Sequence, residues 1–225
     1  IAAAMPLPPV RALLLPVIVE KRTKDAEFCA LELDDGSIGL GYVWLGETLS
    51  GLQGQPLGET LPGMDVVRLA AWYEAADPAR RTLGLAAINA VSQCFFRAAG
   101  YDPQSASDSI GLLDPGAGDH IGMIGLFPPL IERIRASGAR LTVAELNPEL
   151  VEDGDRYRVT LDLAELSSCN KVVSTATILL NDTLDAVIAA CRDASHFGII
   201  GPSAGCLPDP LFARGVDLFG GTAIT

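Results

Sequence analysis

Residues 120–144 read HIGMIGLFPPLIERIRASGARLTVA, and this stretch decides the fold class. The apolar run at 120–125 predicts a buried strand, and the prolines at 128 and 129 open a helix that runs to Arg135. Ser137-Gly138 ends that helix, and a second strand follows at 141–144. Two strands joined by a helix form the crossover unit of a parallel sheet.

The same alternation of strand and helix patterns continues towards the C-terminus. We expect further strands at 171–175, from Phe197 and from Val216. Asn181-Asp182 is expected to cap a helix between the first two of these. The pattern predicts a Rossmann-like α/β domain with a parallel sheet. Residues 101–118 have a linker composition, and we place the domain boundary so that this domain spans 105–225.

The first 104 residues predict a smaller α+β domain. Strands are expected at 12–19, 28–33 and 38–43, and Asp34-Asp35-Gly36 is a hairpin signal, so they form an antiparallel meander. The glycine-rich residues 46–63 suggest a long surface loop. Helices are expected at 65–75 and 81–99, with Gly100 ending the second. The expected apolar stripe of that second helix consists of Leu85, Ile88, Val91, Phe95 and Ala98.

Composition and charge exclude several classes of function. The 225 residues carry a formal net charge of -12, which argues against nucleic acid or an anionic membrane surface as a partner. No apolar run approaches the length of about 18 residues that a membrane span needs. The five cysteines include no Cys-x-x-Cys, so neither a disulfide framework nor a zinc knuckle is expected. A cytoplasmic location is the default expectation.

The two histidines are expected to be structural. His120 and His196 each begin a predicted parallel strand, at the edge opposite the one where such sheets bind ligands. We therefore expect no tight zinc site made by the histidines or cysteines.

Three segments leave the carboxyl ends of predicted strands and should share one rim of the sheet. The first, from Gly125, lacks the Gly-x-Gly-x-x-Gly pattern of dinucleotide-binding domains, although Glu145 ends the next strand where a ribose-binding acid would lie. The second spans residues 174–182, whose hydroxyls could bind an anion or a polar ring, or could serve only as caps. The third is the rigid proline-rich loop 201–212, which is either a ligand loop or a plain crossover.

One polar residue stands out in the first domain. Asn89 is uncommon in the middle of an apolar helix. It is either a buried amide satisfied by backbone groups or a polar group presented to the second domain.

Several motifs resemble one prokaryotic protein family. GLFPPLIE at 125–132, TILLNDTLD at 177–185, and the loop with LPDPLF at 207–212 followed by GVD at 215–217 are similar to proteins described as putative heavy-metal chelation proteins. LAAINA at 85–90 is similar to a helix of that family's first domain. The resemblance implies an enolase-N-terminal-like domain before a Rossmann-like domain, with the site between them. It also implies a C-terminal helix beyond Thr225, and STAT at 174–177 departs from the usual family pattern.

Two functions remain open. The chain is either a small-molecule binding protein linked to metal homeostasis, which binds a metal chelator or metal chelate in the interdomain cleft, or an enzyme acting on a heterocyclic or nucleotide-like substrate there. A base could be Glu145 or Asp209, and a nucleophile Cys206 or Ser203, but none has a visible activating partner. No cofactor is identified, and homo-oligomerisation stays open. The expected ligand-binding residues are Asn89, Gly125, Phe127, Pro128, Glu145, Thr175, Thr177, Asn181, Asp182, Gly201, Pro202, Ser203, Pro208 and Asp209.

Overall fold

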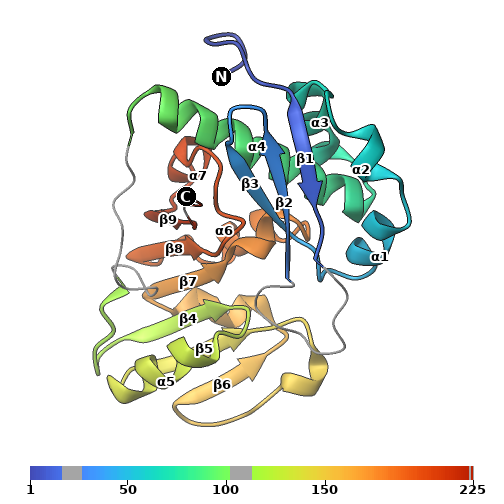
Figure 1. Ribbon diagram of the computed structural model, residues 1–225. Helices are drawn as coiled ribbons and strands as arrows, with labels where there is room; N and C mark the ends of the chain where they lie inside the picture. Colours follow the sequence, from blue (N-terminus) through green and yellow to red (C-terminus); the bar gives the residue numbers. More distant parts are fainter. Residues whose placement is uncertain (17–26, 102–112, 223, 225) are drawn as a thin grey trace. The chain divides into compact units, whose positions relative to one another are not determined.

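The computed structural model describes residues 1–16, 27–101, 113–222 and 224, and divides into two compact units (Figure 1). Unit 1 comprises Ile1–Gln104, Pro202–Leu207 and Gly221–Thr225. Unit 2 comprises Ser105–Gly201 and Pro208–Gly220. The sequence-based expectation assigned the two short C-terminal segments of unit 1 to the second domain. The chain therefore passes between the units at four places.

Unit 1 contains a three-stranded antiparallel sheet in the order β1 (Val10–Leu14), β2 (Phe28–Leu33), β3 (Ile38–Tyr42). The predicted hairpin is confirmed, since Gly36 adopts a φ of 80° between β2 and β3. Part of the first predicted strand, residues 17–19, lies outside the described residues. The enolase-N-terminal-like assignment of this unit remains a prediction.

The prediction of a long surface loop at 46–63 is wrong. This stretch holds α1 (Thr48–Gln53) and α2 (Leu57–Thr60), and its four leucines, Leu49, Leu52, Leu57 and Leu61, are buried in the core of unit 1. Their spacing of three to five residues gives the segment an apolar face, and its burial outweighs the conformational cost of the glycines. α3 (Val66–Ala70) and a 3-10 helix (Ala71–Glu74) follow, and Asp65 caps α3.

The long helix α4 (Pro78–Ala98) packs closely against β3. A Cβ atom at Gly39 would lie 2.0 Å from the Ala86 carbonyl oxygen, and one at Gly41 would lie 2.8 Å from that of Thr82. The predicted apolar stripe of this helix is wrong, because only Leu85 among its residues is buried. Small residues face the sheet instead, since the glycines of β3 admit the helix backbone itself. The buried face carries Leu83, Ala86, Ala87, Asn89, Ala90 and Cys94.

Unit 2 confirms the expected α/β class with a six-stranded parallel sheet (Figure 1). The spatial order is β6 (Tyr157–Thr160), β5 (Arg140–Ala144), β4 (His120–Ile124), β7 (Lys171–Thr175), β8 (His196–Ile200) and β9 (Leu218–Gly220). The sheet grows from β4 to β6 in one direction and from β7 to β9 in the other. Its direction of growth reverses between β4 and β7, and ligands of doubly wound sheets bind outside the strand ends at such a switch point.

The described residues of unit 2 form three α-helices: α5 (Pro128–Ala136), α6 (Leu184–Ala190) and α7 (Asp209–Phe212). Ile121 and Met123 of β4, with Leu141 of β5 and Ile134 of α5, are fully buried in its core. As predicted, His120 and His196 begin β4 and β8. Within the described ranges, every helix is too short or too polar to cross a membrane.

Candidate functional site

The loops after β4 and β7 meet at the switch point of unit 2. Gly125 directly follows β4 with a φ of 80°, and its N–H donates to the Ala144 carbonyl at the end of β5. A Cβ atom at Gly125 would lie 3.1 Å from Cγ2 of Thr175, the last residue of β7. Three strand ends are therefore adjacent at this edge, which we call the carboxyl edge.

Glu145, the residue after β5, binds the loop that follows β4. Its half-buried carboxylate accepts hydrogen bonds from the Leu126 N–H at 3.1 Å and from the Leu146 N–H at 2.7 Å. The residue that could have bound a ribose thus holds the backbone of the loop after β4. Hydrogen bonds to a charged acceptor are the stronger kind, so this contact gives the loop a defined position.

The amino end of α5 is poorly suited to a pyrophosphate. Pro128 and Pro129 have no N–H, and the N–H groups of Leu130 and Ile131 both donate to the Phe127 carbonyl. In dinucleotide-binding domains, amides at this position bind the phosphates. The first turn of this helix offers no such group, which disfavours nucleotide phosphate binding there.

The segment after β7 forms two local turns. Thr175 Oγ1 accepts from the N–H and the hydroxyl of Thr177 at 3.3 Å and 3.0 Å. Asn181 Oδ1 accepts from the N–H and the hydroxyl of Thr183 at 3.3 Å and 2.6 Å. The prediction that Asn181-Asp182 caps the helix is wrong, because α6 begins at Leu184 with Thr183 as its N-cap. The amide oxygen is used in the preceding turn, where Asp182 adopts a φ of 59°.

The end of β8 reaches the same edge. Gly201 has a φ of 143°, and its N–H donates to the Gly220 carbonyl at 2.9 Å. A Cβ atom there would lie 3.4 Å from that of Ala176, the residue after β7. Asp209 begins α7 as an exposed residue, and Pro208 before it is half-buried. The structure thus brings Gly125, Glu145, Thr175 and Gly201 to one edge.

Three predicted ligand residues lie in unit 1, namely Asn89, Pro202 and Ser203. Asn89 is 1% exposed, and its Nδ2 donates to the carbonyls of Leu40 and Ser203, each at 2.8 Å. These contacts favour the buried-amide alternative for Asn89. Any direct contact of Asn89 with a ligand remains a prediction.

The two candidate nucleophiles are poorly placed for attack. Burial raises the pKa of the Cys206 thiol to about 11, so the thiol stays protonated near neutral pH. Ser203 is 1% exposed, and its Oγ is buried. Neither residue has the environment of an activated nucleophile.

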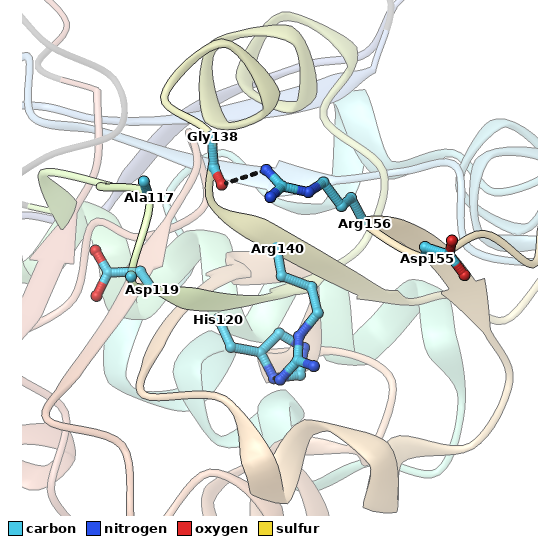
Figure 2. A pocket seen from close by; sticks show the side chains of 8 residues that line it. Ala117, Asp119, His120, Gly138, Arg140, Asp155 and Arg156 are labelled. Carbon is cyan, nitrogen blue, oxygen red and sulfur yellow. Dashed lines mark hydrogen bonds between the residues drawn. The ribbon is translucent and has the colours of Figure 1, made fainter.

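A depression of about 400 Å³ lies at the opposite, amino edge of the unit 2 sheet, and the sequence did not indicate it. Figure 2 shows Arg140 beside His120, and Arg156 reaching the Gly138 carbonyl oxygen. These side chains come together because His120 and Arg140 are paired across β4 and β5. That register could not be read from the sequence.

The polar groups of this depression bind one another. Arg140 Nη2 lies 2.9 Å from His120 Nδ1, which is also 3.2 Å from the Ser168 carbonyl oxygen. The other ring nitrogen, Nε2, lies 2.8 Å from Thr142 Oγ1. Burial and the Arg140 charge lower the pKa of His120. Hydrogen bonds from Asn170, Lys171 and the Gly116 N–H lower the pKa of Asp119 to about 2. These contacts support the structural role expected for His120.

Across the described part of the chain, no group of three or more His, Cys, Asp or Glu side chains is placed to hold a metal ion.

Two family models, both described as "Putative heavy-metal chelation", match residues 108–225 and 16–92. The chain belongs to this family. An uncharacterised protein of Methanocaldococcus jannaschii is 30% identical over 155 residues, which are 67% of this chain and 57% of the relative's length. The match thus spans just over half of that curated relative.

Two solved structures of proteins of unknown function from the DUF364 family share the fold. One, from Desulfitobacterium hafniense, has a TM-score of 0.68 at 22% identity, and the alignment covers 94% of this chain and 78% of the Desulfitobacterium chain. The other, from Pyrococcus horikoshii, has a TM-score of 0.60 at 21% identity, with coverages of 85% and 73%.

Proposed function

We propose that this chain binds a metal chelate, a small organic chelator together with its metal ion, at the carboxyl edge of the unit 2 sheet. The approach of Gly125 to Thr175 at the switch point is the observation that most supports this location. Membership of a family described in terms of heavy-metal chelation supports the link to metals. A cleft with the other unit, and ligand contacts from that unit, are further parts of the proposal.

The chemistry of this edge favours a cationic complex with an aromatic chelator. Glu145, Asp182 and Asp209 place carboxylates in the loops that follow β5, β7 and β8. Phe127, half-buried after β4, offers an aromatic ring, and Thr177 offers a hydroxyl. Carboxylates attract a positively charged complex and can complete the coordination of its metal, while the ring packs on the chelator.

Calorimetry on tag-free protein tests the proposal with the 1:1 complex of nickel(II) and 2,2′-bipyridine as the probe. Nickel(II) alone and bipyridine alone are separate titrations. We expect the complex to bind at least about tenfold more tightly than either component, because only the complex offers both charge and ring. Equal affinity for nickel(II) alone would contradict chelate binding, and so would no binding of the complex.

Variants locate the site. Asp182→Asn and Asp209→Asn should each weaken binding of the complex about two- to tenfold, as expected for the loss of one nearby, partly screened charge. Asp155→Asn is the matched control, because it removes one exposed carboxylate at the amino edge of the same sheet. An equal loss in all three variants would mean that overall charge, and not this edge, governs binding.

A further inference from the structure

Residues 202–207, which we call the strap, belong to unit 1, although the residues on both sides of it belong to unit 2. Gly201, before the strap, ends the β8 segment at the carboxyl edge. Pro208, after it, precedes α7. The strap is therefore covalently continuous at one end with the carboxyl edge, through Gly201, and at the other end with α7, which begins at Asp209.

Helix α4 holds the backbone of alternate strap residues. Asn89 Nδ2 donates to the Ser203 carbonyl at 2.8 Å, and Gln93 Nε2 donates to the Gly205 carbonyl at 3.2 Å. The Leu207 N–H donates to Ser92 Oγ, also at 3.2 Å. Asn89, Ser92 and Gln93 lie three and four residues apart, so they form one face of the helix.

Glycines make this close docking possible. A Cβ atom at Gly205 would lie 3.1 Å from Cγ of Asn89, and one at Gly221 would lie 2.1 Å from the Ala204 carbonyl oxygen. The strap thus fits closely against α4 on one side and the Gly221 backbone on another.

The docked strap leaves hydrogen-bonding capacity unused. Among the described residues, Asn89 Oδ1 and Ser203 Oγ are buried without a partner. Buried polar atoms without partners weaken the state that contains them. The contacts of the strap with α4 are neutral hydrogen bonds, which are individually weak.

We propose that Asn89, Ser92 and Gln93 are positioning residues for the carboxyl-edge site, on which this inference rests. These three side chains hold the strap. Through the strap they set the positions of Gly201, which precedes it, and of Asp209, which follows it. Docking of the strap on α4 and binding of a metal chelate at the edge are then coupled. Coupling is reciprocal, so the chelate should in turn protect the strap.

Hydrogen exchange measured by mass spectrometry on the full chain tests positioning without any ligand. Ser92→Ala and Gln93→Ala should raise exchange rates in residues 203–207 at least about fivefold. They should also raise them in the N–H of Gly201 and in residues 211–213. Gln53→Ala is the matched control, since it removes an exposed glutamine of unit 1 that donates to the Pro16 carbonyl. Faster exchange confined to the strap would overturn the positioning role, whether or not a ligand binds.

Calorimetry with nickel(II)–bipyridine tests the coupling. We expect Ser92→Ala and Gln93→Ala to weaken binding at least about threefold while Gln53→Ala does not. Unchanged affinity in these two variants, with normal binding by the unsubstituted chain, would overturn the coupling and leave the proposed function standing. Failure of the unsubstituted chain to bind the complex would instead overturn the proposed function. Asn89→Ala is a less suitable variant, because the buried Asn89 also bonds Leu40 and its loss can impair folding.

Discussion

Gly125 faces Thr175 across the reversal in strand order, so closely that a Cβ atom at position 125 would lie 3.1 Å from Thr175 Cγ2. Gly125→Ala should lower the free energy of unfolding by about 1–3 kcal/mol, because the φ of 80° is unfavourable for alanine and the new methyl group meets Thr175. Urea denaturation measures this loss.

A double-variant cycle separates the two causes. Thr175→Ser removes Cγ2 but keeps the hydroxyl that binds Thr177, so it should recover part of the loss in the Gly125→Ala background. Gly58→Ala is the control, because a Cβ there meets nothing within 4 Å. An identical cost of Gly125→Ala in both backgrounds would show that the contact with Thr175 is irrelevant.

Glu145 should stabilise unit 2 through its bond to the Leu126 N–H. Glu145→Ala should cost about 1–2 kcal/mol in urea denaturation, and Glu145→Gln less, since an amide oxygen can still accept one of the two hydrogen bonds. The control is Glu149→Ala, an exposed glutamate in the next turn, which should change stability by less than about 0.5 kcal/mol. Equal losses for Glu145→Ala and Glu149→Ala would refute this role.

His120 should titrate below its usual pKa of 6.5. Its folded-state pKa is depressed, so its stabilising contribution is complete above pH 6.5 and is lost as the pH falls through the folded-state pKa. Proton NMR of the imidazole ring can follow this titration. Arg140→Met should raise the titration midpoint of His120, whereas Arg192→Met, at an exposed arginine, should not. A midpoint unaffected by Arg140→Met would mean that the guanidinium does not lower the pKa of His120.

Asp119, at the amino edge of the unit 2 sheet, should make the stability of the folded protein depend on pH in acid solution. Because its pKa is lowered from 3.8 to about 2, its stabilising contribution is present above pH 3.8 and is lost as the pH falls towards 2. Asp119→Asn should therefore be less stable than the unsubstituted chain at pH 7. The gap in melting temperature should shrink between pH 4 and pH 2. A gap that stays constant over that range would contradict the assignment.

The sequence predicted the elements whose own residues carry the signal. The run from His120 to Ala144 contains both strands and the prolines that open the helix, and the structure follows it closely. The edge strand β6 was missed, because of its four residues only Val159 and Thr160 are buried and no helix pattern precedes it. The helices α1 and α2 were missed, because the glycines among their leucines favoured a loop.

The features that the sequence did not reveal are contacts between distant residues. The face of α4 could not be predicted, because it depends on how closely Gly39 and Gly41 let the helix approach. The loop 201–212 was expected in one domain, but its middle is held by Asn89, more than a hundred residues away. Likewise, the pairing of His120 with Arg140 depends on strand register, which local patterns do not encode.

Amide chemical-shift mapping of the ¹⁵N-labelled chain with the diamagnetic zinc(II)–bipyridine complex tests the central claim most directly. We predict that the largest perturbations fall on the amides of Gly125, Thr177 and Gly201 at the carboxyl edge of unit 2. Perturbations centred instead on Gly118 and Arg140 at the amino edge, or no perturbation at saturating complex, would contradict the account.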